Sequence, residues 1–344
     1  MGSEKTGAGK VLVTFASAGE AGRRVAGVAA AARIVRTLAV AGHGRIWLAV
    51  PGGGPLPARA EEDVQRLSEG ATVELVDGNV LEEVRIGRSE IEGLAVLAAP
   101  HLTSMAILKA TGKTSDGPVS LWLNRPVSQR ISALLLLLFA GIRPLHATIG
   151  TFLLAAAMFA ALLLGGDQGL VAGGLLFHSA SVFDGVDGEI ARATFRTSPA
   201  GAALDTFVDM ATNLSFMLGA TINLGRSNGL EAVLVGGWGF LVFAVGLIAV
   251  SRLAASAAGS FSLDLLKHRY RRQFSGRLGS GLIGFGAVVT SRDFFALLFA
   301  LLIVAGAPMG VLYIFAVAAT IWLIFVIAAA LPGQHHHRPH ERSA

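Results

Sequence analysis

The chain has 344 residues, of which 53% are hydrophobic and 15% are charged, and its mean hydropathy of +0.62 excludes an ordinary soluble protein of two domains. The absence of cysteine excludes disulfides and thiolate metal sites. The high hydropathy leads us to expect a multi-pass membrane protein. The net charge of +5 comes from basic loops with no interleaved aromatic residues, so we expect no binding of nucleic acid.

Residues 1–123 are predicted to form a Rossmann-like α/β domain in the cytoplasm. The first ten residues are polar and lack the apolar core of a signal peptide. After them, short β-branched runs alternate with helical stretches rich in alanine or charge, which favours a parallel, doubly wound sheet. The expected strands are Lys10–Phe15, Arg45–Val50, Thr72–Val76, Leu94–Ala98 and Val119–Leu123, and the expected helices are Gly22–Ala41 and Ala58–Ser68.

A loop of small residues, Ala16–Arg24, separates the first strand from a helix that bears Arg and Leu. This arrangement resembles the sugar-nucleotide and inositol-phosphate cytidylyltransferases. Those enzymes usually carry Gly-x-Gly-x-Arg followed by Pro-Lys, and an Asp after a later strand. Here the loop has fewer glycines, no Pro-Lys follows, and Leu94–Ala99 continues into Pro100-His101. We interpret the domain as a degenerate, inactive nucleotidyltransferase-like module. The alternatives are an active cytidylyltransferase, which would make the chain bifunctional, and an unrelated Rossmann-like domain.

Residues 124–141 are predicted to form an amphipathic helix that lies in the membrane interface. Arg125 and Arg130 make one end of this segment basic, and the run Leu134–Phe139 makes the other end apolar. The alternative is that the apolar run is buried within the protein.

Residues 142–332 contain six apolar segments that we predict to be transmembrane helices. All but the fifth are near the roughly 20 residues that a helix needs to cross the hydrocarbon layer. The loops on one side carry a single Arg, whereas the other side carries the turn 192–200, the basic stretch Lys267–Arg272 and a disordered tail, 333–344. The positive-inside rule then places the α/β domain and both termini in the cytoplasm, at the cell (inner) membrane. The six segments are His146–Leu164, Leu170–Arg192, Gly201–Leu224, Ala232–Ala258, Asp293–Gly306 with the apolar run before it, and Val311–Leu331.

Four aspartates lie within the second and third of these segments, where a carboxylate that faced lipid would cost roughly 2.5 to 3.5 kcal/mol. Asp184 and Asp187 are three residues apart, and Asp205 and Asp209 are four apart, so each pair lies on one face of its helix. Two acidic faces joined by a short turn can share cations. Carboxylate oxygens suit Mg²⁺ or Mn²⁺, which complete their coordination with water and substrate phosphate.

From Asp184 to Asp209 the chain reads Asp-x2-Asp-Gly-x2-Ala-Arg-x8-Gly-x3-Asp-x3-Asp. This pattern resembles the signature of the CDP-alcohol phosphotransferases, integral membrane enzymes of phospholipid and inositol-phosphate synthesis, at every specified position. The resemblance implies two divalent ions, Mg²⁺ or Mn²⁺, on the four aspartates Asp184, Asp187, Asp205 and Asp209. It also implies that Asp209 is the general base that deprotonates the acceptor hydroxyl. The residues expected to contact the nucleotide are Asp184, Gly188, Ala191, Arg192, Gly201, Asp205 and Thr148.

Three further residues are candidates for binding the acceptor. His146 follows Leu145, which replaces an Asn often found there in the family, so His146 could take over that contact or serve as a polar anchor at the interface. Arg292 resembles a basic residue at the same place in relatives and could hold a phosphate or form a local ion pair. Arg196 lies in the turn between the two halves of the motif.

The resemblance implies a transferase that moves a phosphatidyl or phosphoalcohol group from a CDP-alcohol, of the CDP-diacylglycerol or CDP-inositol type, to a hydroxyl acceptor such as an inositol phosphate or inositol, and releases CMP. The segment Arg125–Ser132 resembles the members that use inositol phosphate. A phosphatidylglycerophosphate-type synthase and a non-catalytic membrane scaffold or transporter are the alternatives. We also expect contacts with membrane lipids. The resemblance further implies a homodimer through membrane helices, which the Gly/Ala-rich third and fourth segments would allow.

Overall fold

The computed structural model of the chain describes residues 9–52, 54–78, 95–113, 116–256 and 292–330. The chain forms two compact units, each built from segments that are discontinuous in sequence. The first unit comprises residues 1–113, 129–143 and 188–197, and the second comprises residues 114–128, 144–187 and 198–344. The basic stretch Lys267–Arg272 and the predicted tail, 333–344, lie outside the described residues.

The first unit contains a four-stranded sheet in the order β5-β4-β1-β6. The strands are β1 (Gly9–Thr14), β4 (His43–Val50), β5 (Thr72–Asp77) and β6 (Ala95–Ala98). Each neighbouring pair is parallel, which confirms the predicted parallel sheet. The segment 79–94, between β5 and β6, lies outside the described residues.

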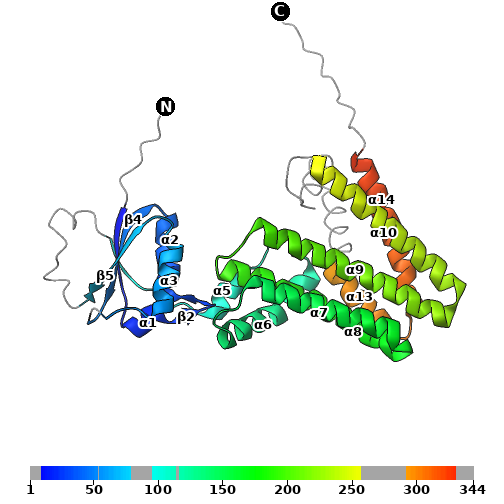
Figure 1. Cartoon of the computed structure of the whole chain (residues 1–344), viewed down its shortest axis with the longest axis horizontal. Helices are drawn as coiled ribbons and strands as arrows, with labels where there is room; N and C mark the ends of the chain where they lie inside the picture. Colours follow the sequence, from blue (N-terminus) through cyan, green and yellow to red (C-terminus); the bar gives the residue numbers. More distant parts are fainter. Residues whose placement is uncertain (1–8, 53, 79–94, 114–115, 257–291, 331–344) are drawn as a thin grey trace, which may run out of the picture. The chain divides into compact units, whose positions relative to one another are not determined.

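Alternate residues of the two central strands face the helices α2 (Ala30–Val40) and α3 (Ala58–Leu67), which lie beside the sheet in Figure 1. Val11 and Val13 of β1 and Ile46 and Leu48 of β4 are completely buried there. Period-two alternation is what a strand with one face on a helical layer requires. Together with buried residues of α2 and α3, these four side chains form the core of the α/β domain.

The predicted helix Gly22–Ala41 is wrong in its first half. The chain instead forms the short helix α1 (Ala18–Gly22), then the hairpin β2 (Arg24–Val25) and β3 (Val28–Ala29), before α2 begins. Ala26 and Gly27 have positive φ angles of 45° and 81°, the left-handed geometry of a two-residue hairpin turn. Gly27 tolerates this conformation without strain, and the turn outweighs the helical preference of the alanines around it.

The predicted strand Val119–Leu123 is also wrong. Residues Ser120–Asn124 form a π-helical turn, η2, that continues directly into α6 (Arg125–Leu138). Pro126 lacks an N–H, and its ring would crowd the preceding turn of a regular α-helix, so the wider π turn accommodates it. The predicted helix over residues 124–141 is therefore present over most of its length, whereas its position in the membrane interface stays a prediction.

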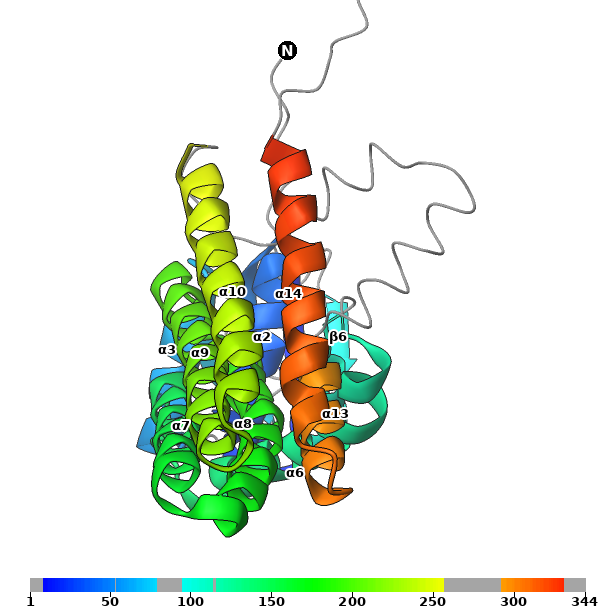
Figure 2. The same ribbon diagram turned by 90° about the vertical axis from the view of Figure 1, so that its right-hand side faces the viewer.

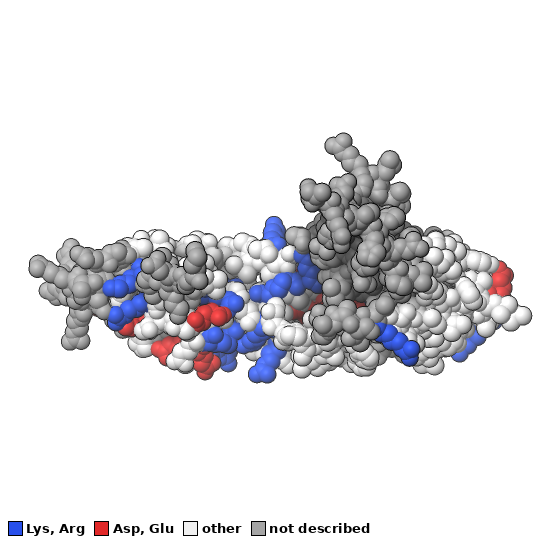
Figure 3. All heavy atoms as spheres, turned by 90° about the horizontal axis from the view of Figure 1, so that it is seen from above, with Lys and Arg blue, Asp and Glu red and all other residues white. Residues whose placement is uncertain are grey.

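Six helices of the described residues coincide with the six apolar segments of the sequence, with ends that differ by a few residues. Three stretches among the described helices are long and apolar enough to cross a membrane: α7, α8 and residues Leu230–Arg252 of α10. This identifies a membrane protein. In Figure 3, charged side chains gather on the left part and at the centre of the view, whereas the described surface on the right, where the membrane helices lie, is mainly uncharged. The helices are α7 (Pro144–Leu164), α8 (Gly166–Ala193), α9 (Pro199–Asn228), α10 (Leu230–Ser256), α13 (Arg292–Val304) and α14 (Met309–Ala330).

Local capping explains where α9, one of the two motif helices, starts and stops. Ser198 is its N-cap and accepts a hydrogen bond from the Gly201 N–H at 3.0 Å, and Pro199 occupies the first turn, where its missing N–H has no cost. Gly229 ends the helix with a φ of 68°. Within α9, the buried Asn223 amide donates to the carbonyls of Leu162 and Gly166, at 2.7 and 2.9 Å, and so fixes the turn between α7 and α8.

The helices of the second unit pack through stacked aromatic side chains between α8, α9 and α13, and through a glycine contact between α10 and α14. Phe177, Phe216 and Phe299 stack across α8, α9 and α13, with centroid separations of 4.0 and 6.0 Å. Figure 2 shows α10 and α14 side by side. A Cβ at Gly246 of α10 would lie 2.2 Å from an atom of the Trp322 ring on α14, so only glycine permits this approach.

Replacing Gly246 by Ala is expected to destabilise the protein by about 1–3 kcal/mol, because the added methyl group overlaps the Trp322 ring. Thermal unfolding of the purified protein in detergent would measure this as a lower midpoint. Gly237→Ala is the matched control, since a Cβ at Gly237 meets nothing within 4 Å, and alanine favours the helix by about 1 kcal/mol. Equal midpoints for the two variants would contradict the packing argument.

Candidate active site

Helices α8 and α9 bring three of the four predicted aspartates together. Asp184 comes from α8, and Asp205 and Asp209 come from consecutive turns of α9. One carboxylate oxygen from each of the three lies within 4.8 Å of the other two, and all three side chains are half-buried. Three negative charges at this separation repel one another unless a cation lies among them.

Arg292, at the first position of α13, supplies one positive charge to this cluster. Its Nη1 lies 3.1 Å from Asp184 Oδ1 and also donates a hydrogen bond to Asp209 Oδ1. The side chain is only 14% exposed. Its other two nitrogens, Nε and Nη2, are buried and have no hydrogen-bond partner among the described residues. The guanidinium therefore contacts two of the aspartates, offsets one of their negative charges and still has N–H groups available for an anion.

The fourth aspartate, Asp187, lies one turn beyond Asp184 on α8 and has a different environment. It is 7% exposed and accepts a hydrogen bond of 2.7 Å from the Thr148 hydroxyl of α7. Its oxygens are not part of the three-residue cluster. Thr148, predicted to contact the nucleotide, therefore orients an aspartate of the motif.

Beyond Asp187, the motif continues along α8 into the segment 188–197 of the first unit. Arg192 Nε donates to the Thr111 carbonyl at 2.7 Å, and a Cβ at Gly188 would lie 2.9 Å from Arg192 Nη1. Glu189, which the sequence did not single out, is completely buried and accepts a 2.6 Å hydrogen bond from Ser132. An acidic residue inside an apolar helix was the only signal that could have found it.

The remaining predicted residues lie in more open positions. His146 and Arg196 are exposed, as are Gly201 and its neighbours at the start of α9. Although the Arg196 side chain is exposed, partial loss of its hydration and, second, the positive charge of the nearby Arg66 lower the pKa of Arg196. Ala191 is half-buried near the end of α8. The acceptor role of His146 and Arg196 stays a prediction.

A groove of 210 Å³ runs between α7 and α9 within the second unit. Val208, which lines it, is the residue before Asp209 on α9, although none of the clustered aspartates lines the groove. Its walls are almost wholly apolar, with Thr212 and Ser215 as the polar exceptions among the lining residues. Such a groove suits a hydrocarbon chain better than a sugar or a nucleotide.

The donor set of the acidic cluster fits a hard divalent cation. It offers only carboxylate oxygens, close enough together to share an ion, and these are the ligands that Mg²⁺ and Mn²⁺ prefer. The unpaired donors of Arg292 beside it suit phosphate oxygens, which usually complete the coordination of Mg²⁺. The cluster is therefore consistent with metal binding, with Asp184, Asp205 and Asp209 as ligands.

Residues 142–331 match the family model described as CDP-alcohol phosphatidyltransferase, and this range contains the whole acidic motif. The chain is also similar to several proteins named bifunctional IPC transferase and DIPP synthase. The one from Thermococcus kodakarensis is 32% identical over 147 residues, which cover 40% of this chain and 32% of that protein. The one from Aquifex aeolicus is 40% identical over 130 residues, which cover 38% and 28%.

A third relative of the same name, from Rubrobacter xylanophilus, is 29% identical over 213 residues, which cover 60% of this chain and 41% of the relative. The matched regions thus span less than half the length of each of these three relatives.

Proposed function

This chain belongs to the CDP-alcohol phosphatidyltransferase family, and on that basis we propose that it transfers a phosphatidyl or phosphoalcohol group from a CDP-alcohol to the hydroxyl of an inositol phosphate or inositol, with release of CMP. The observation that carries the proposal is the convergence of Asp184, Asp205 and Asp209 around a buried arginine that retains unpaired donors. This combination can hold a diphosphate through cations on one side and a guanidinium on the other.

The acidic residues would hold two divalent ions, with Asp187 contributing beside the three clustered aspartates. When bound, such ions neutralise the diphosphate, polarise the phosphorus under attack and stabilise the departing CMP. The Thr148 hydroxyl holds the Asp187 carboxylate in one orientation, because it donates a hydrogen bond to one of the two carboxylate oxygens. Gly188, Ala191 and Gly201 would leave room for cytidine and ribose beside the helices, and Arg192 would bind a nucleotide phosphate.

Asp209 would act as the general base. Its carboxylate takes the proton of the acceptor hydroxyl as the hydroxyl oxygen forms a bond to the phosphorus that carries the alcohol. The bond between that phosphorus and the oxygen of the CMP phosphate breaks, so CMP leaves with the electron pair. The hydrogen bond from Arg292 to Asp209 orients the carboxylate, and the remaining N–H groups of Arg292 would bind a substrate phosphate.

Two observations bear on the substrates. The curated relatives are named as IPC transferase and DIPP synthase proteins, which favours the branch that uses inositol phosphate or its CDP derivative. The apolar groove beside Val208 favours a CDP-alcohol that carries an acyl chain, of the CDP-diacylglycerol type. His146 and Arg196 are the proposed contacts for a charged acceptor.

For the membrane arrangement we propose six spans, with the α/β domain (residues 1–123), the site and both termini on the cytoplasmic side of the cell (inner) membrane. An interfacial helix over residues 124–141 would join that domain to the membrane domain, residues 142–332. The support is the asymmetry of Arg and Lys between the two sets of loops. A homodimer through the glycine-rich membrane helices completes the proposal.

Purified full-length protein in lipid nanodiscs with Mg²⁺ tests the reaction directly. It is given CDP-diacylglycerol or CDP-inositol together with inositol, inositol phosphate or glycerol phosphate, and the products are identified by mass spectrometry. We expect CMP and one phosphodiester product, formed with an inositol-type acceptor. A product only with glycerol phosphate would replace the inositol assignment by a phosphatidylglycerophosphate-type synthase. No CMP from any pair would overturn the proposed function.

A further inference from the structure

The turn that follows α8 is held by the α/β domain. Ala193, the last residue of α8, and Thr194, the first residue of the turn, are only 1% and 2% exposed. Both they and the α/β domain belong to the first compact unit. Phe195 has a φ of 56° and packs against the core of the α/β domain, among residues that lie more than 100 positions earlier in sequence.

Arg33 of α2 makes the central contacts of this connection, and it is only 5% exposed. Its Nε and Nη2 donate to the carbonyls of Val25 and Ala26, at 2.8 and 2.9 Å, and Nη2 also donates to the Ala193 carbonyl at 2.6 Å. Burial lowers the pKa of Arg33 to about 10, partly opposed by the nearby Asp63. The guanidinium stays charged at neutral pH, so it needs these carbonyls to offset its lost hydration.

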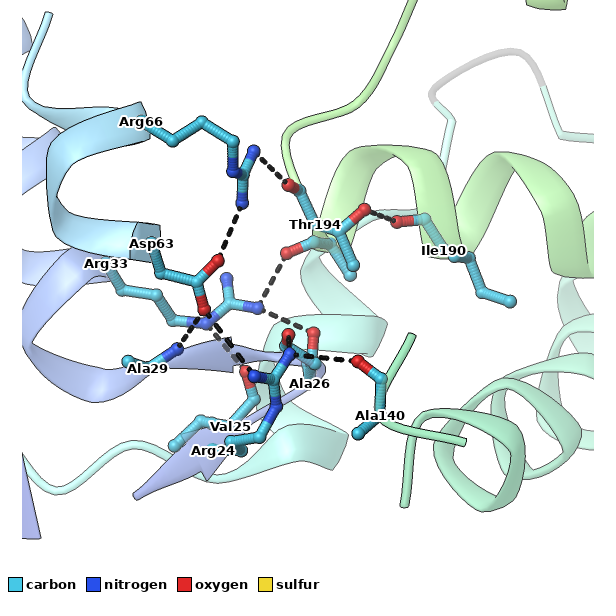
Figure 4. Close-up of polar contacts among 12 residues, drawn as sticks. Arg24, Val25, Ala26, Ala29, Arg33, Asp63, Arg66, Ala140, Ile190 and Thr194 are labelled. Carbon is cyan, nitrogen blue, oxygen red and sulfur yellow. Dashed lines mark hydrogen bonds and ion pairs between the residues drawn. The ribbon is translucent and has the colours of Figure 1, made fainter. Parts of the chain in front are cut away.

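Arg66 of α3 makes a second connection from a different helix. Figure 4 shows Arg66 and Arg33 converging on the turn at Thr194. The Nη1 of Arg66 donates to the Thr194 carbonyl at 3.2 Å, while Nη2 pairs with Asp63 at 3.2 Å. Asp63 also accepts from the Ala29 N–H at 3.2 Å and lies 3.8 Å from Arg24. A single buried carboxylate thus orients the arginine that reaches the turn.

The ring of Phe195 completes the connection. The guanidinium carbons of Arg33 and Arg36 lie 5.3 and 4.7 Å from its centroid, within the range of a cation–π contact. Gly27, in the hairpin turn, approaches Thr194 so closely that a Cβ there would lie 3.2 Å from the threonine methyl group. Hydrogen bonds to the last carbonyls of α8 and an aromatic anchor are what a protein needs to fix a helix end and the turn after it.

We propose that the α/β domain acts as a clamp on the turn between the two halves of the acidic motif, with Arg33 and Arg66 as positioning residues. The turn is the only covalent link between α8, which carries Asp184, and α9, which carries Asp205 and Asp209. Fixing it restricts the relative position of the two helices, and a misplacement of about 1 Å at a catalytic site can cost roughly a hundredfold in rate. This gives the domain a role that needs no nucleotide of its own.

The test compares Arg66→Gln, Arg66→Lys and the control Arg59→Gln in the full-length protein. Arg59 is an exposed arginine on the same helix and makes none of the described contacts with the turn. Hydrogen–deuterium exchange is followed in peptides that cover residues 190–198 and in peptides from β1 and β4, and the rate of CMP release is measured in parallel. The exchange measurement needs no substrate, so it stands even if the proposed reaction fails.

In Arg66→Gln we expect about tenfold faster exchange in the turn, unchanged exchange in β1 and β4, and about tenfold slower CMP release. Arg66→Lys keeps one donor for the Thr194 carbonyl and should recover most of both losses, whereas Arg59→Gln should match the wild type. Turn exchange equal to that of Arg59→Gln overturns the proposal. If β1 and β4 also exchange faster, Phe195→Leu, a change within the turn itself, decides: faster exchange confined to the turn supports the clamp, and unchanged exchange overturns it.

Discussion

Replacing Asp209 by Asn is expected to reduce the rate of CMP release by about 10³-fold. The amide has nearly the same size as the carboxylate but cannot take the acceptor proton, and it brings no negative charge to a metal ion. It also removes the charge that Arg292 pairs with, so the arginine would bind Asp184 alone. The measurement is single-turnover CMP formation by the purified variant in nanodiscs, with saturating CDP-alcohol and acceptor.

Asp167→Asn is the matched control, because Asp167 is an exposed aspartate in the first turn of α8. That variant should release CMP at the wild-type rate. The same thermal unfolding midpoint for the two variants would show that the loss at Asp209 is chemical. A rate for Asp209→Asn within about tenfold of the wild type would remove Asp209 from the role of base.

Removing divalent cations is expected to abolish CMP release, and adding Mg²⁺ or Mn²⁺ should restore it. The physical reason is the composition of the cluster: three carboxylates lie within 4.8 Å of one another, and Arg292 contacts two of them. One guanidinium cannot balance these charges and the diphosphate of a substrate as well. The measurement is CMP release after treatment with a chelator and dialysis, then during titration with each metal.

A second readout separates metal binding from catalysis. Electron paramagnetic resonance of Mn²⁺ should show ions bound to the wild-type protein and to Asp167→Asn, and much weaker binding to Asp184→Asn, which lacks one of the clustered carboxylates. Full activity in protein shown to be free of metal would contradict the assignment, and so would Mn²⁺ binding that does not depend on Asp184.

Local patterns were sufficient to predict much of this structure. The β-branched runs gave the four parallel strands, and the apolar segments gave the six helices of the membrane unit, because burial repeats with the period of each element. The i, i+4 spacing of Asp205 and Asp209 placed them on one face of α9, and the three-residue cluster confirms that Asp184 meets them. Spacing along a helix is a property that the sequence states directly.

Contacts between distant segments could not be read in the same way. Arg292 lies 83 residues after Asp209, and Arg33 lies 160 residues before Ala193, so no local pattern links the partners. Sequence reasoning left Arg292 with two options, a phosphate contact or a local ion pair. In the structure Arg292 forms ion pairs with Asp184 and Asp209, which are distant in sequence. Its neighbour Asp293 accepts a hydrogen bond from the Ser181 hydroxyl.

The errors in secondary structure have the same origin. The hairpin at Arg24–Ala29 replaces the start of the predicted helix. Its turn packs against Leu136 and Thr194, whose positions only the folded chain determines. The run Val119–Leu123 has a strand-like composition, yet most of it forms the π-helical turn that leads directly into α6. In both places the tertiary environment outweighed the local preference.

The interleaving of the two compact units has a practical consequence for dissecting this protein. Since residues 129–143 and 188–197 belong to the same unit as the N-terminal segment, no single cut in the chain separates one unit from the other. A truncation that begins near residue 114 would strip the partners from the Ala193 and Thr194 carbonyls and uncover Phe195. Activity measured on such a fragment would report on a damaged helix end, so point substitutions are the safer way to assign roles to the two parts.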